Sequence, residues 1–315
     1  MLPARWHSEK AGRISRGAFF KSPMTPAIHS EFASWSISYP ITFALFFVAC
    51  GYFRGWLRLR STSLNLILPW QPAAFMSGMF ALWMALGSPL RTLHHELLSI
   101  HMVDHVLLMA VAPPLILLGA PFRSFAQALP QRLFEASAAF VSWFFEQRLG
   151  RVIGNPIFCW VAAVIALIAW HVPAAFELAM RSNLWHAFEY ACFFGTGLLF
   201  WWPVIRPWPA VASWLRWSTV LYLFFATFPC DMLSAFLTFC DRVVYPCYLS
   251  GNQHFEISPL QDQEYAGALM WVCVTFIYLV PAVVITTQLL SSPRPQTDLV
   301  STKVLADKAY MGRIL

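Results

Sequence analysis

Nine histidines occur in the 315 residues, and four of them have the spacing and the setting of metal ligands. His101 and His105 are four residues apart in an apolar segment, so a helix places both imidazoles on one face. His171 and His186 lie at the ends of two further apolar segments. Imidazole is the commonest transition-metal ligand among side chains. The four histidines therefore predict a metal site built from three separate segments.

A lone HxxxH pair also has a simpler interpretation. Two histidines at a membrane interface can hydrogen-bond to lipid headgroups or to backbone carbonyls without binding a metal. His171 and His186 favour the metal site, because they reach the same depth from two other helices, and ionisable side chains inside a membrane bundle are costly and usually functional. Met102, Met109 and Met180 are interpreted as packing residues rather than thioether ligands.

Two acidic residues are candidates for an accessory role at this site. Asp231 is a conspicuous acid inside an apolar segment, where it is either a further ligand or a group that orients a histidine. Asp262 begins the sequence Asp262-Gln263-Glu264 just before the last apolar segment, as in an ordinary helix start at the positive end of the dipole.

The composition indicates the kind of protein that must position these residues. Hydrophobic residues make up 58% of the chain and charged residues 11%, and the mean hydropathy is +0.58. Soluble domains carry about 25% charged residues. Soluble enzymes, disordered proteins and nucleic-acid-binding proteins are thereby disfavoured, and the chain is predicted to be a polytopic membrane protein whose partner surface is the lipid bilayer.

The predicted fold class is all-α, a membrane bundle of seven transmembrane helices and one interfacial helix. A spanning helix needs about 20 mainly apolar residues. The predicted spans are 37–53, 70–88, 101–119, 155–173, 184–204, 217–239 and 265–289. The segment 131–149 is predicted to begin after Pro130 and to lie on the membrane, because charges flank its short apolar run. These limits divide the chain into an N-terminal tail (1–36), a seven-helix membrane domain (37–290) and a cytoplasmic C-terminal tail (291–315).

The basic residues predict the orientation. With seven spans, the C-terminal side carries thirteen lysines and arginines, and the loops of the other side carry three. The thirteen are Arg54, Arg58, Arg60, Arg123, Arg132, Arg148, Arg151, Arg206, Arg216, Arg294, Lys303, Lys308 and Arg313, and the three are Arg91, Arg181 and Arg242. The positive-inside rule then places the N-terminus outside and the C-terminus in the cytoplasm, with every histidine on the outer side.

The N-terminal tail departs from this pattern, because its five basic residues all precede Met24. Either these residues are too far from the first span to count, or translation starts at Met24, which the pattern favours. The seven cysteines form no CxxC pair, which disfavours a thiolate zinc site. Cys240 and Cys247 are placed outside, where a disulfide between them is possible.

Five stretches of the sequence resemble the caa-type cytochrome c oxidase assembly factor family of CtaG-like membrane proteins. They are HMVDHVLLMAVAPPLILLGAP at 101–121, WHVPAAFELAM at 170–180, LWHAFEYACFFGTGLLFWWPVI at 184–205, LSAFLTFCDRVVYPCY at 233–248 and DQEYAGALMW at 262–271. The resemblance covers about residues 75–290. It implies a seven-span protein of the bacterial inner membrane that helps to mature a haem–copper oxidase.

Carried over to this chain, the resemblance makes His101, His105, His171 and His186 the copper residues, with Cu(I) as the expected ion. The family pattern has a second histidine where this chain has Tyr190, and a phenol is a poor Cu(I) ligand. Glu189 is not expected to compensate, since it points about 100° away from Tyr190 on the helix.

The predicted function is that of a non-enzymatic assembly factor that binds copper at the outer face and delivers it to cytochrome c oxidase subunits. A periplasmic copper chaperone is a possible further partner, and no nucleic acid is expected. No nucleophile–base set, phosphate loop or carboxylate pair supports catalysis. Three alternatives stay open: a haem-binding membrane protein resembling cytochrome b, a copper transporter, and a scaffold whose histidines bind nothing. The transporter is disfavoured because the inner halves of the spans show no trail of polar or thioether groups.

Overall fold

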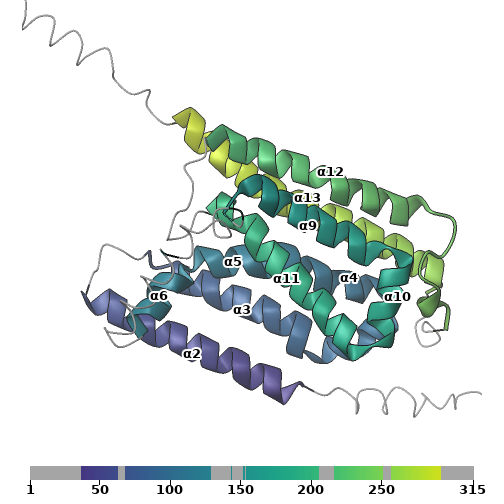
Figure 1. Cartoon of the computed structure of the whole chain (residues 1–315), viewed down its shortest axis with the longest axis horizontal. Coiled ribbons are helices and arrows are strands. Elements are labelled where there is room, and N and C mark those ends of the chain that lie inside the picture. The colour runs from purple at the N-terminus through teal and green to yellow at the C-terminus, as the bar shows by residue number, and fades with distance from the viewer. Residues whose placement is uncertain are drawn as a thin grey trace, which may run out of the picture. The chain divides into compact units, whose positions relative to one another are not determined.

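The structure, a computed structural model, describes residues 37–62, 68–128, 154–205, 216–250 and 257–291, together with the single residues 143 and 152. Within these ranges all regular elements are helices and none is a strand, which confirms the all-α prediction for this part of the chain (Figure 1). The α-helices are α2 (Tyr39–Thr62), α3 (Gln71–Gly87), α4 (Leu98–Val106), α5 (Ala112–Leu118), α6 (Pro121–Ala128), α9 (Pro156–His171), α10 (Pro173–Arg181), α11 (Asn183–Ile205), α12 (Arg216–Phe239) and α13 (Pro259–Ser291). Two short 3₁₀ helices, η1 (Pro89–His95) and η3 (Pro246–Ser250), and one π-helical turn, η2 (Leu107–Val111), complete the set.

Each predicted span coincides with a helix, but not every helix is long enough to cross a membrane unaided. Five stretches are both long and apolar enough, and a sixth is present if α9 and α10 together form one span. The five are Tyr39–Ser61, Leu98–Leu118, Asn183–Ile205, Trp217–Phe239 and Pro259–Ser291. The seven-span count is therefore not confirmed and stays a prediction.

The five spans that qualify alone fall short of the seven predicted spans because of α3 and α9. Helix α3 has 17 residues, at the lower limit for a span, and α9 has 16. Helix α9 ends at His171 and is followed by a 75° bend into α10. Pro173 causes this bend, because a proline lacks the backbone N–H and pushes the preceding residue, Val172, into an extended conformation. The predicted interfacial helix 131–149 and both predicted tails lie outside the described ranges, apart from Trp143 and Ser291.

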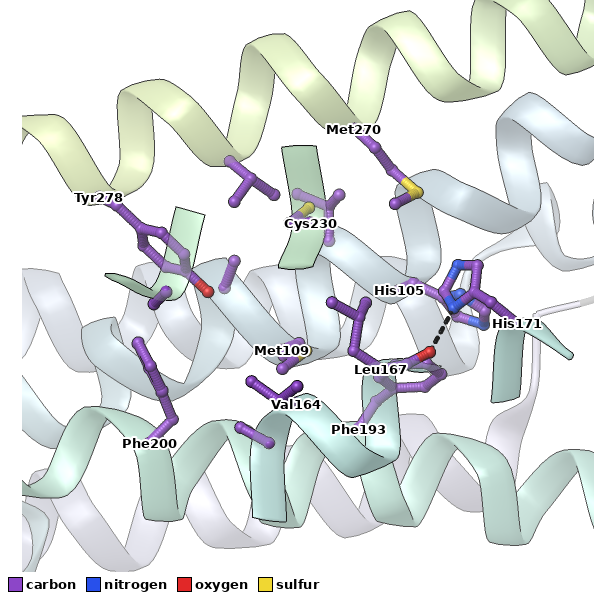
Figure 2. Close-up of a pocket in the computed structure, with 15 residues that line it drawn as sticks. His105, Met109, Val164, Leu167, His171, Phe193, Phe200, Cys230, Met270 and Tyr278 are labelled. Atoms are coloured by element: carbon purple, nitrogen blue, oxygen red, sulfur yellow. Dashed lines mark hydrogen bonds between the residues drawn. The ribbon is translucent and has the colours of Figure 1, made fainter. Parts of the chain in front are cut away.

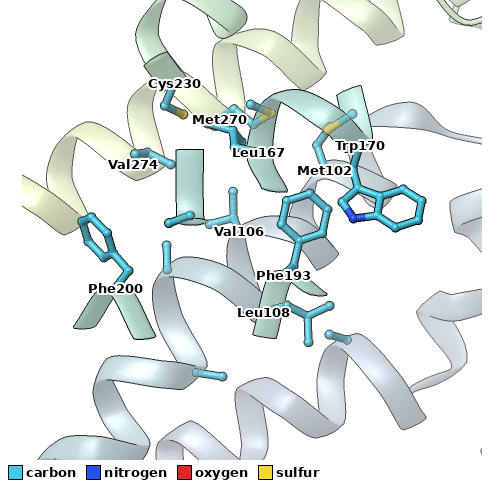
Figure 3. Packing of buried hydrophobic residues seen from close by; sticks show 14 of the residues in the cluster. Met102, Val106, Leu108, Leu167, Trp170, Phe193, Phe200, Cys230, Met270 and Val274 are labelled. Carbon is cyan, nitrogen blue, oxygen red and sulfur yellow. The ribbon is translucent and has the colours of Figure 1, made fainter. Parts of the chain in front are cut away.

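The helices form a bundle in which residues distant in sequence become neighbours. Helix α12 packs along α13, α3 along α5, α9 along α11, and α4 along α13 (Figure 1). A core of leucine, methionine and aromatic side chains fills the spaces between them (Figure 3). Close approach depends on small residues, and at Gly197 of α11 a Cβ atom would lie 2.7 Å from the carbonyl oxygen of Met109 in η2.

Helix α4 continues into α5 through the π-helical turn η2, which follows directly after His105. Pro113 and Pro114 stand just beyond it, and a proline ring clashes with the carbonyl group four residues before it in an ordinary α-helix. The wider π-helical turn lies where this clash would occur. Such turns are frequent at functional sites.

The outer surface of the bundle is rich in large apolar side chains, as expected for helices that face lipid. Examples with more than half of the side chain exposed are Phe46, Phe47, Phe80, Ile157, Ile165, Phe188, Leu221, Phe224, Phe236, Phe276 and Val280. Most of the buried polar side chains, in contrast, gather at one end of the bundle. They are His94, His101, Asp104, His105, His171, His186, Glu189, Asp262 and Gln263.

Asp262 and Gln263 join three parts of the chain at this end. The Asp262 carboxylate accepts hydrogen bonds from the backbone N–H groups of Leu98 (2.6 Å) and Ser99 (3.2 Å), at the first turn of α4. It therefore caps the helix that carries His101 and His105, not only the start of its own helix. Gln263 accepts a hydrogen bond from the N–H of Val244 and donates to the carbonyls of Leu237 and Arg242, which fixes the end of α12 and the loop after it.

Two tyrosines of the segment between α12 and α13 hold the backbone of histidine-bearing elements. The Tyr245 hydroxyl donates to the carbonyl of His171 at 3.0 Å, and the Tyr248 hydroxyl donates to the carbonyl of His94 at 2.8 Å. Burial raises the pKa of Tyr248 well above its usual range, so the phenol keeps the proton that it donates.

The orientation can be tested with reporter fusions at Pro295 and Asn252. The excess of basic residues on the C-terminal side predicts a cytoplasmic reporter at Pro295 and an external one at Asn252. Paired alkaline phosphatase and green fluorescent protein fusions would measure this. The reverse pattern would move the buried histidines to the cytoplasmic side.

Replacing Asp262 should destabilise the bundle. In Asp262→Ala the N–H groups of Leu98 and Ser99 lose their acceptor in a buried setting, which costs about 1–3 kcal/mol. We expect a lower melting temperature of the purified protein in detergent. Asp241→Ala, which removes an exposed carboxylate of the neighbouring loop, is the matched control and should melt as the unaltered protein does. Equal melting of both variants would contradict the capping role.

Candidate metal site

Five buried side chains from three elements form a cluster at the polar end of the bundle. His101 and His105 come from α4, His171 from the end of α9, and His186 and Glu189 from α11. We call these five residues the histidine cluster. All are at least 95% buried. The ring centroids of His101 and His105 are 4.4 Å apart, those of His105 and His171 5.4 Å, and those of His101 and His186 5.6 Å. The four histidines predicted from sequence are thus brought together.

Glu189 lies among these rings. Its Oε1 atom is 3.2 Å from Nε2 of His105 and 3.7 Å from Nε2 of His101, and its Oε2 atom is 4.0 Å from Nε2 of His186. His101, His105 and Glu189 each offer one ligand atom, and these three atoms all lie within 4.8 Å of one another. Donor atoms around one ion with bonds of about 2.1 Å lie up to about 4 Å apart, so small side-chain rotations would complete this set.

The polar atoms of the cluster are largely without hydrogen bonds. Both ring nitrogens of His101 and His105, the Nε2 atoms of His171 and His186, and both carboxylate oxygens of Glu189 are buried and make none. Buried polar groups are nearly always hydrogen-bonded, because desolvation without a partner costs free energy. Eight such atoms that converge on one place have the chemistry of a cation site.

His171 is held in one orientation by the backbone. Its Nδ1 atom lies 2.7 Å from the carbonyl oxygen of Leu167, which requires that Nδ1 carry the proton (Figure 2). The Nε2 atom is then left with its lone pair. A ring fixed by a backbone carbonyl in this way is typical of metal-binding histidines.

The two predicted accessory acids do not lie in the cluster. Asp262 caps α4 and so positions His101 and His105 through the backbone. Asp231 lies on α12, and no hydrogen bond or ion pair among the described residues joins it to the cluster. Its neighbour Cys230 is the residue of this pair that faces the core.

Tyr190 has a hydrogen-bond partner within the protein. Its hydroxyl donates a 2.7 Å hydrogen bond to Oδ2 of Asp104, and the same oxygen lies 3.8 Å from Nδ1 of His94. The phenol is buried and its ring lies 4.3 Å from that of His186. Tyr190 therefore links the histidine cluster to a further buried histidine, His94.

Glu189 faces the histidines although it points away from Tyr190, which the sequence analysis did not anticipate. It follows His186 by three positions and so shares the same face of α11. The spacing His186-x-x-Glu189, with an acid inside an apolar segment, was the signal that could have identified it.

A cavity of about 40 Å³ adjoins the cluster in the core of the bundle. His105 and His171 line one end and Phe200 and Tyr278 line the other (Figure 2). Three sulfur-containing side chains from three elements, Met109, Cys230 and Met270, line the space between. The sequence did not reveal this grouping, since each sulfur belongs to a different helix.

All seven cysteines are free thiols, so the possible disulfide between Cys240 and Cys247 is not formed.

Comparison with known proteins gives a family match. The family model described as cytochrome c oxidase caa3 assembly factor matches residues 50–292, which include the whole histidine cluster. Uncharacterized proteins of Mycobacterium bovis and Mycobacterium tuberculosis are each 24% identical over 278 residues, or 85% of this chain and 41% of theirs. An uncharacterized protein of Mycobacterium leprae is 23% identical over 257 residues, or 80% of this chain and 39% of its own. The chain thus spans about two fifths of the length of these relatives. No solved structure matches it.

Glu189→Gln should separate metal binding from folding. The substitution keeps the shape of the side chain but removes the charge that faces His101 and His105. We expect metal affinity to fall by more than the 10–100-fold typical of residues that only support a ligand. Because the substitution keeps the side-chain shape and removes a costly buried charge, the metal-free melting temperature should stay the same or rise.

The matched control is Glu264→Gln, which changes an acid of α13 outside the cluster. Competition with a chromophoric Cu(I) chelator and thermal unfolding would measure both quantities. Unchanged affinity in Glu189→Gln would contradict the assignment of Glu189 to the site.

Proposed function

Because the chain belongs to the cytochrome c oxidase caa3 assembly factor family, we propose that it binds copper in the histidine cluster and delivers it to a cytochrome c oxidase subunit. Copper is the cargo in this proposal and no covalent catalysis is involved. The several long apolar helices agree with a multi-pass membrane protein. The distribution of basic residues supports the outer face of a bacterial inner membrane as the place of binding.

One observation carries this proposal: the buried, unpaired polar atoms of the cluster. Imidazole nitrogens suit copper, and a single carboxylate balances the charge of a monovalent ion. Cu(I) among neutral imidazoles and one Glu189 carboxylate gives a site with no net charge, which is the least costly arrangement in an apolar bundle. The sulfur atoms along the adjoining cavity also favour the reduced, softer ion.

Within the cluster, we assign the ion to His101, His105 and Glu189, whose ligand atoms lie closest together. His171 and His186 lie beside them with their Nε2 atoms unpaired, and they complete or exchange the ligand set during transfer. The ion leaves by ligand exchange with the client subunit, with no change of oxidation state. A periplasmic copper chaperone is the proposed donor.

A haem-binding protein is the less well supported alternative. A haem held by two histidines lies between their rings, whereas neighbouring rings of the cluster are 4.4–5.6 Å apart and in edge or tilted contact. The adjoining cavity of about 40 Å³ is far below the 300 Å³ or more of typical cofactor sites.

A copper transporter needs a path onward from the cluster. The sulfur side chains of Met109, Cys230 and Met270 provide the beginning of one, which the sequence did not suggest. The far end of the cavity is lined by Phe200 and Tyr278, which offer no soft ligand. Delivery to a partner at the histidine end therefore fits better than passage through the bundle.

The test is to measure bound copper and oxidase activity together. The purified protein should bind copper and show no Soret band of haem. His101→Ala and His105→Ala should each abolish stoichiometric copper, because a poorly solvated ion would lose a direct ligand. In cells that lack the native gene, the same variants should fail to restore oxidase activity. His7→Ala, in the N-terminal tail, is the control that should keep both.

Full copper and full oxidase activity in the His101 and His105 variants would overturn the proposed site. A Soret band without copper would favour the haem-binding alternative.

A further inference from the structure

A second cavity, of about 350 Å³, opens at the surface next to the histidine cluster. His95, Glu177, Met180, Arg181, Pro246 and Cys247 line it. They come from η1, α10 and η3, so three elements that are distant in sequence converge there. We call it the surface cavity. Its lining combines an imidazole, a thioether and a thiol, which are the three side-chain ligands that suit Cu(I).

A continuous series of imidazole rings leads from the surface cavity into the cluster. The ring of His95, which is exposed, lies 4.2 Å from the ring of buried His94. The ring of His94 lies 4.8 Å from that of His186, and His186 lies 5.6 Å from His101. Each step is short enough for an ion to bind the next ring as it leaves the previous one.

We propose that the surface cavity is the loading site for Cu(I), which His95, Met180 and Cys247 accept and pass through His94 and His186 to the buried cluster. This inference rests on the proposed copper function and adds the route by which the ion arrives. The ion stays Cu(I) throughout. The Cys247 thiol releases a proton to solvent when it binds the ion and regains one when the ion moves on.

The surroundings of His94 suit such a route. The Tyr248 hydroxyl contacts both the carbonyl of His94, at 2.8 Å, and the sulfur of Met180, at 3.9 Å. One side chain therefore ties the wall of the surface cavity to the backbone of the first buried histidine. Oδ2 of Asp104 lies 3.8 Å from Nδ1 of His94 and is fixed by Tyr190. The carboxyl group beside this ring can supply negative charge to a passing cation, which would lower the cost of bringing the ion into the bundle.

The route predicts that loading rate and final occupancy respond to different residues. The full chain, purified in detergent, would be mixed with the Cu(I)–bicinchoninate complex, and the loss of the chelate absorbance would follow transfer. We expect Met180→Leu combined with Cys247→Ser to slow loading at least 10-fold, and His95→Gln to slow it further. Copper bound at equilibrium should stay as in the unaltered protein, because the buried cluster is intact.

The matched control is Met232→Leu combined with Cys240→Ser. Met232 is an exposed residue of α12. Cys240 lies in the connection between α12 and α13, as Cys247 does, but it does not line the surface cavity. The loading rate of this control variant should be unchanged. Melting of the metal-free variants checks that folding is retained.

A second readout does not depend on any substitution of the cavity. One equivalent of Ag(I), a redox-inert substitute for Cu(I), added just before a maleimide pulse should protect Cys247 from alkylation but not Cys240. Mass spectrometry of the two peptides measures the difference. After a long incubation the protection of Cys247 should decline, because the ion has moved to the buried cluster.

The outcomes separate this inference from the proposed function. If the unaltered protein binds no Cu(I), both fail. If it binds Cu(I) but the loading rate is the same in the surface-cavity variant and in the control, only the loading route is overturned. If the surface-cavity variant folds but loses equilibrium copper as well, its residues belong to the final site and the route is overturned. Equal alkylation of Cys240 and Cys247 under Ag(I) also contradicts it.

Discussion

The strongest physical constraint on the polar end of the bundle is a carboxylate buried among imidazoles. Glu189 is fully buried, faces three histidines, and makes no hydrogen bond. An isolated charge in such surroundings is costly, and replacing it by an apolar group would normally stabilise the protein. The cation of the proposed function would neutralise it, and would so account for an arrangement that folding alone disfavours.

The devices that hold this arrangement act through the backbone. The Asp262 carboxylate caps the helix of His101 and His105, and Leu167 fixes the ring of His171. Pro173 ends α9 at His171, and the Tyr245 hydroxyl holds the carbonyl of the same residue. These contacts fix the main chain and, at His171, the ring, while the Nε2 atoms of the four histidines make no hydrogen bond. Such preorganisation would lower the cost of binding the proposed ion.

The positions of the helices could be predicted from sequence, because the length of an apolar run is a local signal. The pairing of His101 with His105 could be predicted for the same reason, from their i, i+4 spacing. The sequence was not sufficient for Glu189, whose role depends on how three helices meet, nor for the capping of α4 by Asp262 across 164 positions. The grouping of Met109, Cys230 and Met270 is likewise a product of packing. The seven-span count depends on α3 and α9, which are short, and on a bend that a hydropathy pattern does not resolve.

X-ray absorption at the copper K-edge of the Cu(I)-loaded protein would identify the atoms bound to the ion. We expect nitrogen and oxygen neighbours at about 2.0–2.2 Å, with the outer-shell scattering of imidazole rings. Glu189→Gln should alter that shell. A shell made of sulfur alone at about 2.3 Å would place the ion among cysteine and methionine side chains instead, and would contradict the histidine cluster as the binding site.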